Sequence, residues 1–464
     1  MTEPSPGALS ASPPGGAWRP PAPVPKEMLS LADGELLAML PEAGYERSII
    51  PLRKGKRPLT ILNDPAAIRS VLVDNAMRFP KSDVMVAALE PLVGEGVLIS
   101  NGALWRRQRA MLDPAFAHMR VQAMFPTMAR AIEAFIRRLR DSKRAFALDE
   151  EISSLALEII CRSIFSDGLD GDTARHVFEA FSAYQRTLPQ AGPMVLLGYA
   201  RHDDGPELRL ATETLRSLVG GLVEARLSRR ASDAEPGDVL QSILAARDSD
   251  GRGFTMREIV DQVMVCFLAG HETSASALTW ALFILSQLPD TAAAVRAEVE
   301  SVAPDRLLKY EEVGGLALVR TIFLETLRLY PPAAFLTRLA LERTAFGEHV
   351  VEAGSLVVIS PWLVHRHRAL WDAADRFVPA RFSRQREKEI RSGSFIPFGL
   401  GPRVCPGRVV AMIEGPYLMA EIIRHFDLEV LNAAEIMPVG RLTVRPNVGI
   451  NCLARPARAD LPAT

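Results

Sequence analysis

The chain has 464 residues, of which 48% are hydrophobic, so it is long enough to bury a large core. Its 54 basic residues nearly balance its 55 acidic ones, which gives no indication of nucleic-acid binding. The four cysteines (Cys161, Cys266, Cys405 and Cys452) are scattered without C-x-x-C spacing. This pattern argues against a disulfide framework or a zinc site, and we expect a reducing, cytoplasmic setting.

The N-terminal 26 residues contain eight prolines and little else that could pack. We therefore predict a flexible or extended tail over residues 1–26, followed by a single domain over residues 27–464. The tail has no apolar segment of the signal-peptide type. No run of 18 uninterrupted apolar residues occurs in the chain, so we expect no membrane anchor.

Helical periodicity dominates the chain, and strand-like runs are few. The first is Leu59–Leu62. Two more, Val350–Val351 and Leu356–Ile359, flank Ala353-Gly354 and predict a hairpin. The last strand-like stretch runs through Leu442–Val444 and Val448–Leu453.

The first helix with candidate binding residues carries Trp105 and Arg109, which share a face at spacing i, i+4. The clearest helix starts at the capping box Thr255-Met-Arg-Glu258 and is predicted to run to Leu288, where Pro289 ends it. These 34 residues would span about 50 Å.

The segment Ala269-Gly270-His271-Glu272-Thr273-Ser274 lies near the middle of this helix. We expect the Thr273 hydroxyl to donate to the Ala269 carbonyl one turn back, which opens the helix locally and leaves a polar notch in an apolar wall.

Two E-x-x-R pairs follow. Glu325 and Arg328 have apolar neighbours, so we predict a buried pair that needs further partners, and Arg381 is a candidate third member. The second pair, Glu421 and Arg424, we interpret as an ordinary pair on a helix surface.

A glycine-rich loop from Phe398 to Gly407 surrounds Cys405, and a helix-like run from Arg408 to Ile422 follows it. Each part has a chemical reason if Cys405 binds a metal as thiolate. Glycines 399, 401 and 407 would permit turns closed to other residues, so that backbone amides approach the sulfur. The start of a helix favours an anion. Phe398 could shield the site, and Arg403 could neutralise an acidic group beside it.

The loop pattern F-x-x-G-x-R-x-C-x-G resembles the haem-binding loop of the cytochrome P-450 family of haem-thiolate monooxygenases. The segments at 269–274, 325–328, 377–382 and 105–109 resemble four further motifs of that family, in the same order. The resemblance covers most of residues 30–460. It implies a mainly α fold with small β-sheets, in which haem b (heme b, iron protoporphyrin IX) lies between the long central helix and the helix after Cys405.

The resemblance also implies roles for individual residues. Cys405 would be the axial ligand of the iron, favouring O–O cleavage. Thr273 would help deliver protons to bound dioxygen, with Glu272 as the acidic link to solvent, while Ala269 and Gly270 leave room for O₂. Glu325, Arg328 and Arg381 would lock the region beneath the loop. The remaining cofactor-binding residues would be Trp105, Arg109, Arg338, Phe398, Arg403 and Gly407.

The implied activity inserts one atom of O₂ into an apolar organic substrate, with electrons from NAD(P)H delivered by a separate ferredoxin or flavodoxin. We expect a monomer. Two alternatives remain open. One is a peroxide-driven peroxygenase or hydroperoxide isomerase, which the presence of Glu272 and Thr273 disfavours. The other is a haem-binding sensor without turnover.

Substrate specificity is expected, by resemblance, in Phe79–Leu98, Gln185–Leu197 and Ala333–Leu336, which are rich in apolar residues and favour a terpenoid, a fatty acid or an aromatic compound. For the electron donor, we predict a basic docking patch formed by the arginines that flank the motifs on the cysteine side: Arg106, Arg107, Arg366, Arg368 and Arg408.

Overall fold

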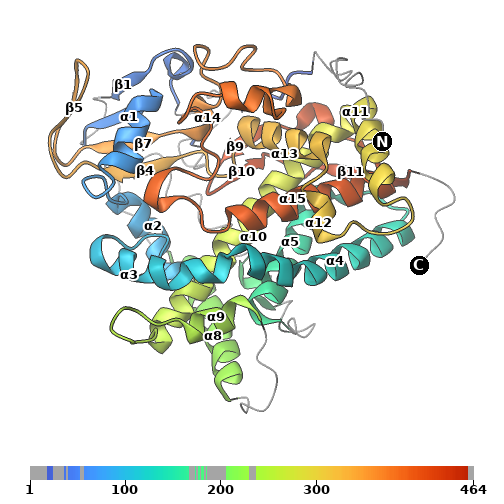
Figure 1. The fold of residues 1–464 in the computed structure, drawn as a ribbon, viewed down its shortest axis with the longest axis horizontal. Coiled ribbons are helices and arrows are strands. Elements are labelled where there is room, and N and C mark those ends of the chain that lie inside the picture. The colour runs from blue at the N-terminus through green and yellow to red at the C-terminus, as the bar shows by residue number, and fades with distance from the viewer. Residues whose placement is uncertain are drawn as a thin grey trace, which may run out of the picture.

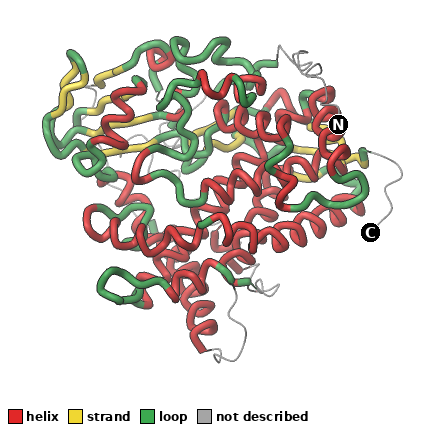
Figure 2. Tube along the Cα trace, viewed as in Figure 1, coloured by secondary structure: helices red, strands yellow, loops and turns green. Residues whose placement is uncertain are grey.

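The computed structural model describes residues 18–23, 36–37, 40–52, 57–166, 205–228 and 237–457, with isolated positions between 167 and 204. Helices make up most of this part of the chain, and strands gather in a few small groups (Figures 1 and 2). The predicted fold class, mainly α with small β-sheets, is confirmed.

The described helices have the following bounds: α1 (Pro65–Arg69), α2 (Asp83–Val93), α3 (Gly102–Leu112), α4 (His118–Asp141), α5 (Leu148–Phe165), α8 (Pro206–Ser228), α9 (Val239–Ala245), α10 (Met256–Ser286), α11 (Pro289–Val302), α12 (Tyr310–Val313), α13 (Ala317–Leu329), α14 (Pro361–Val364) and α15 (Arg408–His425). Short helical turns include η4 (Ser70–Asp74), η7 (Pro379–Phe382) and η9 (Gly401–Arg403).

The described strands have the following bounds: β1 (Ile49–Leu52), β2 (Leu59–Leu62), β3 (Phe146–Ala147), β4 (Leu336–Leu339), β5 (Thr344–Phe346), β6 (His349–Val351), β7 (Leu356–Ile359), β8 (Phe426–Val430), β9 (Pro438–Gly440), β10 (Val444–Pro446) and β11 (Asn451–Pro456).

The largest sheet has the order β1-β2-β7-β4. Strand β7 pairs in parallel with β2, with Leu59 opposite Leu356, and antiparallel with β4. The predicted hairpin between Val350–Val351 and Leu356–Ile359 is therefore wrong. The first run lies in β6, which pairs with β5. The second run, Leu356–Ile359, is fully buried as β7 and lies between β2 and β4.

Helix α10 passes through the middle of the molecule, between α8 and α9 on one side and the sheet on the other (Figure 1). The predicted capping box is present: the Glu258 amide donates to Thr255 Oγ1 (3.3 Å), and the Thr255 amide donates to Glu258 Oε2 (2.8 Å). The helix ends at Ser286, two residues before the predicted end. It packs against α5 and α15, so most of its residues are buried.

The predicted lock around Glu325 is confirmed in its geometry. Arg328 donates from Nε and Nη2 to the two oxygens of Glu325, both at 2.7 Å, and neither side chain is exposed. Arg381 Nε reaches Glu325 Oε1 at 3.4 Å. The other hydrogens of the Arg328 guanidinium go to backbone carbonyls of His365, Ala374 and Arg376. The pair is thus satisfied throughout, as a buried ion pair requires.

Two other predictions are wrong. Glu421 and Arg424 do not form a surface pair, because both are buried and their helix α15 lies against α11 and α4. Trp18, inside the segment predicted as a tail, packs edge-on against Phe283 and Phe377 at centroid distances of 6.4 and 6.3 Å. The tail therefore does not include this residue.

Within the described residues, no single helix is long and apolar enough to cross a membrane. One pair, α10 with α11, meets that test only when taken together, and it is bent by 112°.

Candidate functional site

The loop before α15 holds Cys405 in a series of tight turns. The Cys405 amide donates to the Phe398 carbonyl at 2.9 Å, and the Val404 amide donates to the Gly401 carbonyl at 3.0 Å. Gly399 and Gly401 have φ of +74° and +73°, a region that other residues rarely adopt. These bonds present Cys405 at the N-terminal end of α15.

Two glycines of this loop, Gly401 and Gly407, serve different purposes. A Cβ on Gly401 would lie 2.1 Å from the Leu72 carbonyl oxygen, so only glycine allows η9 to approach η4 this closely. Gly407, by contrast, has φ of −77° and is the N-cap of α15. Our prediction that Gly407 adopts a turn closed to other residues is therefore wrong, although a Cβ there would lie 3.8 Å from the sulfur.

Cys405 is exposed in the protein chain alone. Crowding by the surrounding protein atoms nevertheless raises the pKa of its thiol, and the Gly407 backbone and the charges of Arg109 and Arg408 act against that shift. A bound metal cation is what would favour the thiolate here.

A cluster of cations lies beside this loop. It consists of Lys81, Arg338 and Arg403, and we call it the cation cluster. Lys81 forms an isolated β-bridge with Arg338. The Arg403 guanidinium lies over the Trp105 ring at 4.3 Å and donates from Nη2 to the Ser100 carbonyl and to Asn101 Oδ1.

The cation cluster lacks counter-charge. None of its three members has a carboxylate partner within the described part of the chain, and Arg403 Nη1 is buried with no hydrogen-bond acceptor there. Burial and the charge of Arg403 lower the pKa of Arg338 to about 10. Burial, Arg338 and Arg403 lower the pKa of Lys81 well below its ordinary value. Burial and the charge of Arg109 lower the pKa of Arg403 to about 10. An anionic ligand would relieve this repulsion and satisfy the orphan donor.

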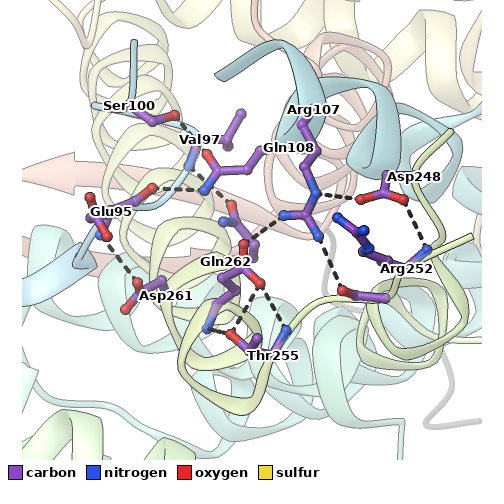
Figure 3. Close-up of polar contacts among 12 residues, drawn as sticks. Glu95, Val97, Ser100, Arg107, Gln108, Asp248, Arg252, Thr255, Asp261 and Gln262 are labelled. Atoms are coloured by element: carbon purple, nitrogen blue, oxygen red, sulfur yellow. Dashed lines mark hydrogen bonds and ion pairs between the residues drawn. The ribbon is translucent and has the colours of Figure 1, made fainter. Parts of the chain in front are cut away.

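The loop that supports the cluster is itself held by α10 (Figure 3). The amides of Glu95 and Val97 donate to Asp261 Oδ2 (3.1 Å) and Gln262 Oε1 (3.0 Å). Gln108 then joins Ser100 Oγ to the Glu95 carbonyl. These contacts fix the Ser100 carbonyl, to which Arg403 donates.

Trp105 and Arg109 lie on one face of α3, as predicted. Trp105 is buried beneath the Arg403 guanidinium. Arg109 donates from Nη1 to the Val404 carbonyl at 2.7 Å and from Nε to Asp113 at 2.5 Å. Arg109 thus holds the Cys405 loop through its backbone.

The hydrogen bond predicted in the notch segment of α10, Ala269–Ser274, is present: Thr273 Oγ1 donates to the Ala269 carbonyl at 2.6 Å. The predicted local opening of the helix is wrong, because the helix runs through this segment without a break. A Cβ on Gly270 would meet Ile160 Cδ1 at 2.7 Å, so the structure assigns this glycine to the close approach of α5 and α10, where we had predicted room for O₂.

Ser274, which follows Thr273, connects this segment to α15, the helix after Cys405. Ser274 Oγ donates to Glu414 Oε2 on α15 at 3.3 Å. Burial raises the pKa of Glu414 to about 7, against a small lowering by Ser274. The notch of α10 and the helix that follows Cys405 therefore lie against one another.

Glu272 turns to another side of α10, toward β10. It is buried and forms an ion pair with Arg445 and a hydrogen bond with Thr443 Oγ1 (3.2 Å). Its side chain is therefore held by residues at the start of β10, a contact that the sequence did not indicate.

A family model described as Cytochrome P-450 matches residues 40–451. The chain belongs to the cytochrome P-450 family.

Among its relatives is a "Cyclooctatin synthase" of Streptomyces melanosporofaciens, 34% identical, with 87% of each chain covered. A "Cyclooctat-9-en-7-ol 5-monooxygenase" of the same organism is 30% identical over 85% of this P-450 chain and 84% of the relative. A "Pentalenene oxygenase" of Streptomyces avermitilis is 28% identical, with 85% and 87% covered. This chain is thus a P-450 monooxygenase, and its family's cofactor is haem b.

The residues of this P-450 fit haem. The cation cluster supplies unpaired positive charge where two propionates need partners, and Cys405 is open beside it. Lys81 is the member of the cluster that sequence reasoning missed. It lies between Pro80 and Ser82 in a stretch that also holds Arg78 and Asp83, and no motif connects it with Arg338, so the sequence carried no signal for it.

Of the five arginines in the predicted docking patch, one is buried and two are paired with carboxylates, and the patch itself stays a prediction. Arg366 is buried and its guanidinium lies 3.5 Å from the Trp362 ring centroid. Arg107 binds Asp248, Glu258 and the Gly253 carbonyl (Figure 3), and Arg368 binds Glu42 and Glu46. Arg106 and Arg408 are exposed, as the prediction requires.

Proposed function

We propose that this P-450 inserts one oxygen atom from O₂ into an apolar organic substrate, with NAD(P)H as the electron source and a separate ferredoxin or flavodoxin as the carrier. Two electrons and two protons enter, one oxygen atom joins the substrate and the other leaves as water. The observation that carries the proposal is the exposed Cys405, held beside a cation cluster without counter-charge.

The haem, when bound, supplies the iron at which O₂ is activated. Cys405 would be its metal ligand, with the loop from Phe398 to Gly407 shaping the sulfur's surroundings. Arg338, Arg403 and Lys81 would bind its propionates, and Trp105 would hold the Arg403 guanidinium in place. Arg109 acts one step further away, since it binds the Val404 carbonyl.

Proton handling would fall to Thr273 and Glu272. The Thr273 hydroxyl directs its hydrogen to the Ala269 carbonyl, which leaves its oxygen lone pairs to accept a proton or bind a water. Glu272, the residue before Thr273 in α10, would take up protons from the solvent side.

For the substrate we propose a cyclic, largely hydrocarbon compound of the terpenoid type. Two relatives carry names that print such compounds, an alkenol and pentalenene. Two of the three segments assigned to specificity, residues 79–98 and 333–336, are described, and Leu89, Leu92 and Val93 among them belong to an apolar cluster that includes α10. The third, Gln185–Leu197, lies outside the described residues. A binding titration that follows the haem spectrum should rank pentalenene and related cyclic compounds above fatty acids and aromatics. If a fatty acid or an aromatic compound binds tightest, the substrate proposal fails.

The donor would dock on the side of Arg106 and Arg408, and charge reversal at Arg408 should slow reduction and flatten its salt dependence. Reduction at an unchanged rate from low to high salt would place the docking surface elsewhere. We further propose a monomer in the cytoplasm.

The central test compares Cys405→Ala with Cys452→Ala, a buried thiol in β11. The reduced wild type and Cys452→Ala should show the carbon monoxide band of thiolate ligation, and Cys405→Ala should lose it while its circular dichroism is unchanged. A band that persists in Cys405→Ala refutes the ligand assignment.

A second experiment addresses the alternatives. Product that forms with NADH and a surrogate ferredoxin system supports the monooxygenase. Product with peroxide alone would indicate a peroxygenase or hydroperoxide isomerase, and spectral binding without turnover would indicate a sensor.

A further inference from the structure

The start of α3 departs from the usual chemistry of a helix N-terminus. Asn101, its N-cap, belongs to a residue type that normally accepts a hydrogen bond from an amide of the first turn, yet its side chain makes no such bond. Ser82, the N-cap of α2, does cap its helix and accepts from the Met85 amide at 3.2 Å. Gly102 has φ of +60°, so the chain turns sharply between Asn101 and the rest of α3. A residue well suited to capping is thus used for another purpose.

The Asn101 side chain joins two members of the cation cluster. Its Oδ1 accepts hydrogen bonds from the Lys81 amide at 2.9 Å and from Arg403 Nη2 at 3.0 Å. Its Nδ2 donates to the Lys81 carbonyl at 3.4 Å. One side-chain amide therefore binds a backbone segment on one side and a guanidinium on the other.

These bonds orient the Arg403 guanidinium. Its Nη2 carries two hydrogens, which go to Asn101 Oδ1 and to the Ser100 carbonyl (2.9 Å). They fix the rotation of the planar group, and the Trp105 ring, 4.3 Å from the guanidinium carbon, fixes its plane. Arg403 Nη1 is then the buried nitrogen without an acceptor in the described part of the chain. Asn101 thus helps to decide which nitrogen Arg403 presents to a ligand.

Lys81 is held from two sides. On one side it forms a β-bridge with Arg338, whose strand β4 belongs to the largest sheet. On the other side Asn101 binds both its backbone amide and its backbone carbonyl. The three cations of the cluster come from segments far apart in the sequence, and the β-bridge and the Asn101 amide are contacts that join them.

We propose that Asn101 is a positioning residue for the cofactor: by joining the Lys81 backbone to the Arg403 guanidinium, it holds the cation cluster ready for the haem propionates, and the capping of α3 is given up for this. A site arranged before the ligand arrives binds it more tightly, because less order is lost on binding. The inference rests on the part of the proposed function that assigns the cation cluster to the propionates, and it does not depend on the substrate.

A purely structural role for Asn101 makes a different prediction. If Asn101 serves only to start α3, serine should replace it, since serine caps helices about as well as asparagine does. If Asn101 joins the two cations, serine should fail. Its hydroxyl lies one bond nearer the backbone than Asn101 Oδ1, so it does not reach both Lys81 and Arg403.

The experiment measures the transfer of haem from the holoprotein to excess apomyoglobin for wild type, Asn101→Ser and Asn101→Ala. The matched control is Asn432→Ser, because Asn432 also joins two backbone groups, the Gly449 carbonyl and the Asn451 amide, both at 2.9 Å, but in the segment after β8. Haem should leave both Asn101 variants about tenfold faster than wild type, as expected for the loss of a hydrogen bond to a charged group, and Asn432→Ser should match wild type.

A second measurement separates positioning from structure. The same proteins are reconstituted with the dimethyl ester of haem, whose propionates carry no charge. The ester should leave wild type faster than haem does, because the cation cluster then has no anionic partner. Wild type and both Asn101 variants should lose the ester at equal rates, since an effect exerted through the propionates disappears with their charge.

Loss of haem from Asn101→Ser at the wild-type rate overturns the inference, because a capping residue then suffices. A variant that loses the ester as much faster than wild type as it loses haem, or that takes up neither cofactor, also overturns it. If wild type loses haem and ester at the same rate, the assignment of the cation cluster to the propionates fails, and the inference fails with it. Failure of the proposed monooxygenase activity is observed separately, as the absence of product with NADPH and donor, and leaves these rates unaffected.

Discussion

Glu414 should make the protein less stable as the pH rises through neutrality. It is buried where α10 meets α15, its hydrogen-bond partner is Ser274 at 3.3 Å, and burial raises its pKa to about 7 from an ordinary 4.5. The folded protein thus holds this proton more tightly than the unfolded chain does. The stabilising contribution is complete below pH 4.5 and is lost as the pH rises through 7.

The magnitude follows from the difference between the two pKa values. At about 1.4 kcal/mol for each unit, a difference of two to three units corresponds to about 3 kcal/mol in the free energy of unfolding. Most of this loss falls between about pH 5 and pH 8, because the unfolded chain begins to release the proton near 4.5 and the folded protein releases it near 7.

Glu414→Gln removes the titration, so its stability should fall less steeply between pH 5 and pH 8 than that of wild type. Urea unfolding of the haem-loaded proteins, followed by circular dichroism at each pH, measures the difference in slope. The glutamine amide adds a constant offset, so the slope and not the absolute stability is compared. The control is Glu348→Gln, at an exposed position. Parallel pH profiles for wild type and Glu414→Gln would refute the reasoning.

Three further outcomes are expected. Gly401→Ala should lower haem content and the unfolding midpoint far more than Gly347→Ala, because both sites have positive φ but only the Gly401 Cβ would meet backbone, at 2.1 Å from the Leu72 oxygen; equal effects would attribute the loss to φ alone. Thr273→Ala should keep substrate binding and NADH consumption while peroxide replaces product, whereas Thr214→Ala, which removes a similar hydroxyl at an exposed position of α8, should form product as wild type does; unchanged coupling in Thr273→Ala would exclude Thr273 from the relay. Lys81→Met should weaken haem retention about ten- to a hundredfold in transfer to apomyoglobin, since a hydrogen bond to a charged group contributes about 1.5–3 kcal/mol. The exposed Lys143→Met should have no effect, and equal retention in both would remove Lys81 from the site.

Local sequence determined the elements whose causes lie within a few residues. Thr255 and Glu258 marked the start of α10 because a capping box involves only its own four residues. Thr273 bonded Ala269 because one helical turn separates them. The loop around Cys405 was recognised for the same reason, since its positive-φ glycines and the helix that follows are contiguous.

Apolar character alone did not determine which surfaces meet. Val350–Val351 and Leu356–Ile359 looked like two halves of a hairpin, yet the second run pairs with β2 and β4. Strand pairing depends on what else covers each face, and local pattern does not report that. Likewise, Glu421 and Arg424 have the spacing of a surface pair, and only the packing of α15 buries them.

The partners of charged residues were decided only by the tertiary structure. Arg107 was predicted to belong to a basic docking patch, but it forms ion pairs with Asp248 and Glu258, far along the chain. Lys81 joined Arg338 and Arg403, and Arg445 reached Glu272 across 173 residues. A charge accepts any partner of suitable sign, so its spacing in sequence says little. The residues that bear the chemistry could therefore be read from motifs, whereas those that hold and supply them depend on which distant segments the fold brings together.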